Sequence, residues 1–230
     1  MELKEDTAIK EIKQLQKEMD EDRYKLCYEN VVGVMDANIR AIGKELSMEC
    51  GREVIKSVSS RLKTPESIYQ KLRRKQLPIS LSNAKASSTD LIGMRIVVMF
   101  LDDVYHVAGL LKSLKGLRLI EEKDYIAMPK DNGYMSLHLI FEIETYHDMK
   151  MRTERMEVQI RTMAMDCWSA LDHQMIYKKD LTGIANIQEE LTRYSTEIAA
   201  MDKRMMDIRN LIEQKVNYPP LSLTARSGGL

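Results

Sequence analysis

Three polar side chains alternate with apolar ones in the segment MEVQIRT, residues 156–162. In an extended strand alternate residues face opposite sides, so Glu157, Gln159 and Arg161 project from one face. A carboxylate, an amide and a guanidinium in one row suit the wall of a polar cleft. Antiparallel sheets often have one solvated face, and taken alone the pattern is better explained in that way.

An acidic residue precedes a second apolar segment, and a basic residue lies inside it. Asp90 comes shortly before the run IGMRIVVMF, which contains Arg95. An unpaired buried charge is costly, so Arg95 must reach an edge of the sheet or a partner. We interpret Asp90 as a cap or turn residue or as part of a polar site. Arg95 is interpreted as half of a structural ion pair or as a ligand contact.

A third group of candidate residues lies in RLKTPESIYQKLRRK, where a threonine cap followed by proline predicts the start of a helix. Lys63, Ser67 and Lys71 are four residues apart and share one face of this helix, and Arg61 lies just upstream. Cations beside a helix N-terminus form a natural site for a polyphosphate. The alternative is a solvated basic face, which explains most such runs.

The segment DYIAMPKDNGYMSLH, residues 124–138, carries more polar and aromatic side chains than a simple hairpin requires. Gly133 permits an unusual backbone angle, so Tyr134 is expected at an exposed loop tip. An aromatic ring in that position can stack on a nucleobase. Lys130 and His138 can bind phosphate. The alternative is a hairpin whose tyrosine folds back on the core.

The whole chain has the composition of a folded protein, with 230 residues that are 44% hydrophobic and 30% charged. Its 35 basic and 35 acidic residues balance, which argues against binding nucleic acid or membranes through the overall field. The three cysteines are far apart and indicate neither a zinc site nor a disulfide framework. The first residues are charged, and no apolar run approaches the ~20 residues of a membrane helix, so we expect a cytoplasmic protein.

The apolar periodicity predicts helices over residues 1–50. Residues 51–180 then read as β-α-β-α-β-β-β-α, which predicts an α+β fold. We expect a mixed β-sheet of about five strands with helices packed on it, flanked by N- and C-terminal helices. Residues 181–216 are expected to form the C-terminal helix, and residues 217–230, rich in Pro, Ser and Gly, a loose tail.

The predicted C-terminal helix has a heptad-like apolar stripe. Its members are Ile184, Ile187, Leu191, Tyr194, Ile198, Met201, Met205, Ile208 and Ile212. The stripe either packs on the chain's own N-terminal helices or forms a subunit interface, and both interpretations stay open.

Four segments occur together in a specific order: RLKTPESIYQKLRRK, DLIGMRIVVMF, KDYIAMPKDNGYMSLHL and MEVQIRTMAMDCWSALDHQMIYK. They resemble the synthetase domain of the RelA/SpoT family, and specifically its short stand-alone members, the small alarmone synthetases. The resemblance covers roughly residues 50–180 and implies a nucleotidyltransferase-like synthetase fold. It also implies that ATP donates its β,γ-pyrophosphate to the ribose 3′-hydroxyl of GTP or GDP. The products would be AMP and pppGpp or ppGpp, which signal the stringent response.

The resemblance further implies roles for the candidate residues. Asp90 would bind Mg²⁺, and Glu157 would act as general base or help to position the metal. Tyr134 would stack on guanine. The implied ATP side consists of Arg61, Lys63, Ser67, Lys71 and Arg95. The implied GTP or GDP side consists of Lys130, Asn132, Tyr134, His138, Gln159 and Arg161.

Two other functions are considered on the same fold. One is a toxin-like relative that pyrophosphorylates adenine nucleotides or tRNA 3′ ends. The other is a non-catalytic nucleotide- or RNA-binding regulator, although pure binding does not require both Asp90 and Glu157. As in the small relatives, we expect a homo-oligomer, a tetramer, whose central cleft could bind a regulatory nucleotide or RNA.

Some residues depart from the family pattern. Met135 stands where small relatives often carry Arg, and Asp172 where they usually carry Glu. The preference among GTP, GDP and GMP is therefore left open. The isolated pair His147–Asp148 is expected in a loop and predicts no metal-dependent hydrolase site.

Overall fold

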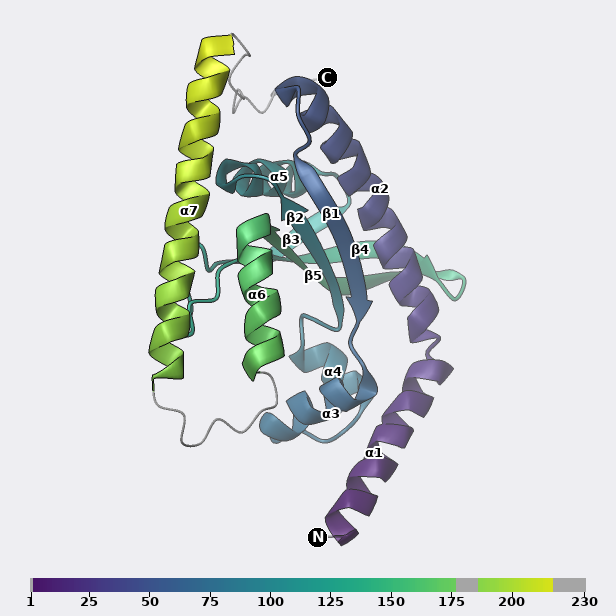
Figure 1. Cartoon of the computed structure of the whole chain (residues 1–230). Helices are drawn as coiled ribbons and strands as arrows, with labels where there is room; N and C mark the ends of the chain where they lie inside the picture. Colours follow the sequence, from purple (N-terminus) through teal and green to yellow (C-terminus); the bar gives the residue numbers. More distant parts are fainter. Residues whose placement is uncertain (1, 177–185, 217–230) are drawn as a thin grey trace.

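The computed structural model describes residues 2–176 and 186–216 of the chain. Two helices precede the sheet, α1 (Glu2–Glu21) and α2 (Tyr24–Cys50), as predicted for residues 1–50. They meet at Arg23, whose φ of 49° turns the chain between them. Helix α1 points away from the sheet at its N-terminal end (Figure 1).

Five strands form one mixed sheet in the order β1-β2-β5-β4-β3. They are β1 (Ile55–Leu62), β2 (Ile92–Val98), β3 (Leu117–Asp124), β4 (Leu137–His147) and β5 (Lys150–Thr162). All neighbours run antiparallel except β2 and β5, which are parallel. The predicted α+β fold with a mixed sheet of about five strands is confirmed.

The remaining helices connect and cover these strands. They are α3 (Pro65–Arg74), α4 (Leu81–Ser87), α5 (Leu101–Ser113), α6 (Met163–Ile176) and α7 (Ile187–Val216). Helix α3 begins as predicted, because Thr64 Oγ1 accepts the Ser67 N–H at 3.3 Å. Helix α4 is absent from the predicted order, since seven residues are too few to show a helical period. Within the described ranges, no helix combines the length and apolar character that crossing a membrane demands.

The two faces of the sheet differ in chemistry. Apolar residues on one face pack with α2 and α5 to form the main core, including Ile92, Met94, Ile96, Leu137, Leu139, Phe141, Met156, Val158 and Ile160. Helices α6 and α7 lie on the side away from α2 (Figure 1). The polar residues of β5 face α6, so the candidate site forms between the sheet and this helix.

Helix α7 makes its main contacts with α6 and α5 rather than with the N-terminal helices. This is not the intrachain packing that one interpretation of the apolar stripe expected. Leu191 is buried, but Tyr194, Met201, Met205, Ile208 and Ile212 are between 48% and 56% exposed. Ile184 and the expected tail at 217–230 lie outside the described residues.

The pair His147–Asp148 lies where β4 turns into β5. His147 is the last residue of β4, is buried, and has Nε2 3.1 Å from the carbonyl oxygen of Asp22. Asp148 and Met149 form a two-residue turn with φ of 51° and 59°, which matches the twist of the flanking strands. The loop prediction is therefore wrong for His147, because strand pairing continues through it to Lys150.

Candidate active site

Two lysines hold Asp90 at the N-terminal end of β2. The Nζ atoms of Lys63 and Lys71 lie 2.6 Å from Oδ2 and Oδ1 of Asp90, respectively. Burial alone would raise the pKa of Asp90, but the hydrogen bonds and charges of the two lysines bring that pKa down to about 2. Burial lowers the pKa of Lys63, and Asp90 opposes this only in part. Asp90 is therefore a carboxylate at any physiological pH.

The lysines open onto a cleft of about 460 Å³ between α3, the end of β1 and α6. All four residues expected to hold ATP phosphates line it: Arg61, Lys63, Ser67 and Lys71. The polar part of the wall also includes Thr64, Glu66, Gln70, Arg74 and His173. The structure thus gathers the predicted cationic group into one concave surface, at the N-terminus of α3.

A row of residues crosses the sheet from this cleft toward Glu157. Arg61 on β1 pairs with Gly93 on β2, and Gly93 pairs with Glu157 on β5. The Arg61 side chain lies over Gly93, where an added Cβ atom would be in ordinary van der Waals contact with Cγ of Arg61, at 3.4 Å. Arg61 also lines a smaller cavity of about 110 Å³ together with Arg95 and Gln159.

Glu157 is held by two neighbours on the polar face. Gln159 Nε2 donates to its Oε1 at 2.6 Å, and His138 Nδ1 lies 3.5 Å from its Oε2. Burial would raise the pKa of Glu157, but His138 and Gln159 outweigh it and the net pKa is lowered. The charge of Asp90 acts in the opposite direction on the same carboxyl, so the two acids lie close enough to interact.

Arg161, Tyr134 and His138 form a hydrogen-bonded chain that ends at Glu157. Arg161 is 1% exposed, and its Nη2 donates to the Tyr134 hydroxyl at 2.8 Å and to Gln159 Oε1 at 2.7 Å. The Tyr134 hydroxyl lies 2.8 Å from Nε2 of His138. Because its oxygen already accepts from Arg161, the hydroxyl is assigned as donor to Nε2, which leaves the proton on Nδ1 facing Glu157.

Tyr134 is folded inward, as the alternative of a tyrosine folded back on the core predicted, and not at an exposed loop tip. Its ring makes edge contacts with Tyr125, His138 and Trp168, at centroid distances of 6.1, 5.8 and 6.5 Å. Burial raises the pKa of its hydroxyl, although Arg161 opposes the shift. The physical reason for the inward position is that buried Arg161 and His138 both need a hydrogen-bond partner.

The turn around Tyr134 is held by its own polar groups. Asn132 Oδ1 accepts the Tyr134 N–H at 3.2 Å, so this side chain shapes the turn. Lys130 Nζ lies over the rings of Tyr125 and Tyr134, 4.5 and 4.7 Å from their centroids. Lys130 and His138, both expected on the acceptor side, therefore flank the same aromatic ring.

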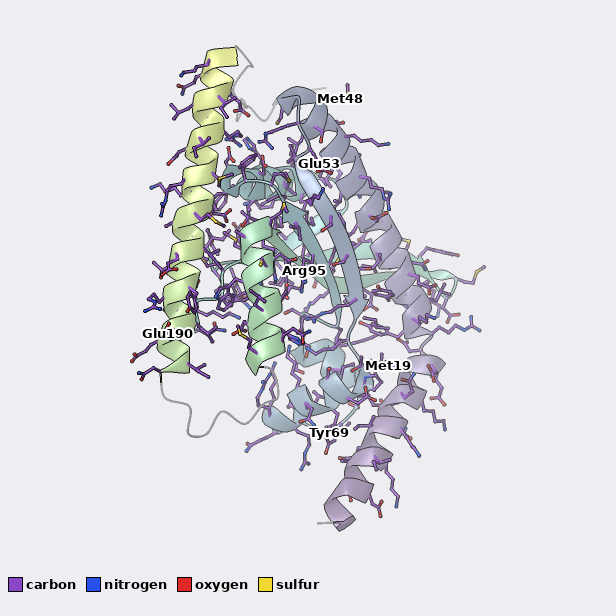
Figure 2. All side chains as sticks on the ribbon, viewed as in Figure 1. Met19, Met48, Glu53, Tyr69, Arg95 and Glu190 are labelled. Atoms are coloured by element: carbon purple, nitrogen blue, oxygen red, sulfur yellow. The ribbon has the colours of Figure 1, made fainter. Side chains whose placement is uncertain are left out.

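Arg95 lies between β2 and α6 (Figure 2), where its Nη1 is 3.2 Å from Asp166 Oδ1. Arg161 Nη1 lies 3.3 Å from the same oxygen. The interpretation of Arg95 as half of an ion pair therefore fits the structure, and its side chain still lines the smaller cavity.

Several residues of the site did not stand out as site residues in the sequence. Asp166 and Trp168 both lie on α6, and His173 lines the lysine cleft. All three lie in the last of the four segments that resemble the RelA/SpoT family, and α6 follows directly on the polar strand β5. Met135 is buried and does not present itself to the cleft.

Comparison with known proteins places this geometry in a family. The family described as the region found in RelA / SpoT proteins matches residues 60–182. The GTP pyrophosphokinase YwaC of Bacillus subtilis is 34% identical over 188 residues, which cover 82% of this chain and 90% of YwaC. The chain belongs to the RelA/SpoT family. A second relative, the GTP pyrophosphokinase YjbM of the same organism, is 29% identical over 195 residues, covering 84% of this chain and 90% of YjbM.

Solved structures of RelA/SpoT family members share the fold. Small alarmone synthetase 1 from Bacillus subtilis, bound to its product pppGpp, aligns with a TM-score of 0.76 and 28% identity, over 85% of this chain and 99% of that one. Small alarmone synthetase 2 from the same organism aligns with a TM-score of 0.71 and 34% identity, over 80% and 96% of the two chains. The resemblance drawn from the four sequence segments is confirmed.

Proposed function

We infer that this member of the RelA/SpoT family is a GTP pyrophosphokinase, which makes pppGpp or ppGpp and AMP for stringent-response signalling. One observation carries the proposal: Asp90, held by two lysines of the cleft just before β2, lies near enough to act on Glu157 of the neighbouring strand β5, which is linked to the chain of Arg161, Tyr134 and His138. A pyrophosphate transfer needs this arrangement, because two polyphosphates must be brought together against their repulsion.

The lysine-lined cleft is the proposed site for the ATP phosphates. Lys63 and Lys71 both line this cleft, and their ammonium groups are paired with Asp90 in the structure. They can turn to phosphate oxygens when the nucleotide enters. Arg61 and the N-terminus of α3 add positive potential on the same wall.

Mg²⁺ is the proposed cofactor, and the donor set fits it. In phosphoryl-transfer sites this ion is usually held by one or two carboxylates together with substrate phosphates and water. Asp90 and Glu157 both have lowered pKa values and offer carboxylate oxygens at neutral pH. Among the described residues there is no group of three or more His, Cys, Asp or Glu that would form a complete cage. When bound, the ion would offset the charge of the transferring phosphates.

Glu157 is the proposed base for the acceptor hydroxyl. The 3′ oxygen forms a bond to the β-phosphorus of ATP while the bond from that phosphorus to the bridging oxygen of AMP breaks. Glu157 takes the hydroxyl proton, and Gln159 and His138 keep its carboxylate oriented and ionised. Because a carboxylate is a weak base, the proton moves as the new bond forms rather than before it.

The acceptor nucleotide is proposed to bind beside Tyr134. Lys130, His138 and Arg161 surround this ring and can supply hydrogen bonds or positive charge to the guanine nucleotide. Stacking of guanine on Tyr134 requires Lys130 to leave the ring face, and the same movement would free its ammonium group for a phosphate.

A panel of acceptors tests the proposed function. The purified protein would be incubated with ATP, Mg²⁺ and, in turn, GTP, GDP, GMP, ADP or uncharged tRNA, and the products would be identified by mass. We expect AMP together with a guanosine nucleotide that carries a 3′-pyrophosphate. Transfer only to adenine nucleotides or tRNA would establish the toxin-like activity instead, and nucleotide binding without any transfer would establish a regulator.

The exposed stripe on α7 is the proposed surface for self-association. Its apolar side chains repeat at helical spacing over several turns and are about half exposed. Contiguous exposed apolar surface of this kind marks an interaction site. A second copy of the chain would offer an equally apolar surface to cover it, and we propose a homo-oligomer, a tetramer.

The proposed division of the chain is into N-terminal helices (1–50), a synthetase domain (51–180) and a C-terminal helix (181–216). We also propose that the protein is cytoplasmic and that it binds a regulatory nucleotide or RNA.

A further inference from the structure

Helix α7 touches the turn that presents Tyr134. The link between β3 and β4 reaches the side of α7 (Figure 1), where Ser195 Oγ donates a hydrogen bond to the Gly133 carbonyl. One turn earlier, Thr192 Oγ1 donates to the Asp131 carbonyl at 3.1 Å. Ser195 is 3% exposed, so this contact is closed to water.

Gly133 approaches Ser195 so closely that position 133 has no room for a residue with a side chain. Gly133 has a φ of +80°, and a Cβ atom built on it would lie 2.5 Å from the Cβ of Ser195. It would also lie 3.4 Å from the Cα of Thr192. The glycine is thus required by its backbone angle and by the approach of α7.

Helix α7 also supports the Tyr134 ring from a second direction. Trp168 on α6 makes an edge contact with Tyr134, and its Nε1 donates to the Leu191 carbonyl at 3.4 Å. Leu191 and Ser195 lie one turn apart on the inner face of α7, and both are buried. Residues 191–195 of α7 therefore contact both the backbone of the turn and, through Trp168, the Tyr134 ring.

Two backbone hydrogen bonds of the turn are internal, whereas the Tyr134 side chain ties the end of the turn to β4 and β5 through His138 and Arg161. Lys130 N–H donates to the Tyr134 carbonyl at 3.2 Å, and Gly133 N–H donates to the Lys130 carbonyl at 2.7 Å. These bonds shape the turn but move with it. The contacts with α7 come from 62 and 61 residues away in the chain, so they help to set the position of the turn as a whole.

We propose that Ser195 and Thr192 of α7 are positioning residues for the acceptor nucleotide. They hold the turn at 131–133 and thereby fix the position of Tyr134 at the proposed site of the guanine nucleotide. Through Tyr134 they also fix the hydrogen-bond partners His138 and Arg161. This proposal rests on the proposed function, since it assigns the turn to the acceptor. It makes α7 a part of the acceptor site through the turn and not through a contact with the Glu157 carboxylate.

Steady-state kinetics on Ser195→Ala tests the proposal. Thr196→Ala is the matched control, because its Oγ1 bonds only within α7, to the Thr192 carbonyl at 3.0 Å, and it is exposed. We expect Ser195→Ala to raise the KM for GDP about tenfold, the effect of leaving one buried carbonyl without its donor. The KM for ATP should stay within about twofold, and Thr196→Ala should change neither constant.

Thr192→Val provides a second variant that keeps the side-chain shape and removes the hydroxyl. We expect this variant to raise the KM for GDP as well, but only about threefold. An equal rise in both KM values would mean that Ser195 only supports the fold, and unchanged GDP constants in both variants would overturn the proposal.

Direct binding of GDP separates this proposal from the proposed function. Calorimetric titration of the full chain with GDP alone should show the same tenfold loss in Ser195→Ala and none in Thr196→Ala. If the wild type binds GDP with this pattern but makes no pyrophosphorylated product, the positioning role stands and the proposed function fails. If product forms and GDP affinity is insensitive to Ser195, the proposed function stands and the positioning role fails.

Discussion

The Nζ atom of Lys63 lies 2.6 Å from Oδ2 of Asp90, and Lys71 holds the other carboxylate oxygen at the same distance. Each of the three side chains is largely shielded from water, so each charge is stabilised mainly by its partner of opposite sign. Asp90 thus offsets only part of the positive charge of the proposed phosphate cleft before a nucleotide arrives. Any change to Asp90 should affect both the stability of the fold and the binding of phosphate.

Replacing Asp90 by Asn should destabilise the protein as well as inactivate it. The substitution leaves two lysine side chains that are 15% and 19% exposed without their counter-charge. We expect the free energy of unfolding to fall by about 1–3 kcal/mol, measured by urea titration at neutral pH. Glu144→Gln, which neutralises an exposed acid on β4, is the control and should stay within about 0.5 kcal/mol of wild type. A stability equal to wild type would show that the lysines do not depend on Asp90.

The stability of the fold should depend on the ionisation of Asp90 in acid. Its pKa is about 2 in the folded chain against an ordinary value of 3.8. A depressed folded pKa means that the stabilisation is fully present above the ordinary pKa and is lost as the pH falls toward the folded one. The difference in unfolding free energy between wild type and Asp90→Asn should therefore shrink by up to about 2 kcal/mol from about pH 5 to about pH 2. A constant difference over that range would contradict the assignment.

The hydroxyl of Tyr134 should matter separately from its ring. Tyr134→Phe keeps the aromatic face but removes the oxygen that links Arg161 to His138. Because Arg161 is buried, we expect a loss of about 1–2 kcal/mol in stability and a rise of about fivefold in the KM for GDP. Tyr134→Ala should lose acceptor binding much further if guanine stacks on the ring. Equal effects of the two substitutions would argue against stacking.

Those parts of the fold that depend on neighbouring residues could be predicted from the sequence, and those that depend on distant segments could not. Helix α3 could be predicted from its cap and proline, and β5 from its strict alternation, because both signals lie within a few residues. That Asp90 lies near Glu157 follows from the parallel pairing of β2 with β5, which joins segments more than sixty residues apart. Sequence order alone does not contain that register.

The candidate site was likewise predictable in its parts but not in its conformation. The polar row of β5 and the cationic face of α3 were both identified from residue spacing. The inward position of Tyr134 was only one of two alternatives, because the choice is decided by the hydrogen-bond needs of buried Arg161. The contact of Ser195 with Gly133 left no signal in either segment, since each residue is ordinary in its own helix or turn.

The apolar stripe of α7 should hold the oligomer together. Met205→Asp and Ile208→Asp place a charge on side chains that are 52% and 51% exposed in the single chain. Such a change leaves the monomer fold intact but opposes burial in an interface, so we expect a monomer by light scattering at micromolar concentration. Lys203→Asp, at an exposed position of the same helix, is the control and should leave the assembly unchanged. A wild type that is already monomeric at this concentration would contradict the proposed interface.

Transfer of label from ATP to GDP tests the central claim most directly. With ATP labelled in its γ-phosphate, the wild type should move the label into a 3′-pyrophosphorylated guanosine and release one AMP for each product. Glu157→Gln should lower this transfer by about 10²–10⁴-fold while its fold and its ATP binding persist. Release of labelled phosphate with ADP, or transfer that continues unchanged in Glu157→Gln, would contradict the account.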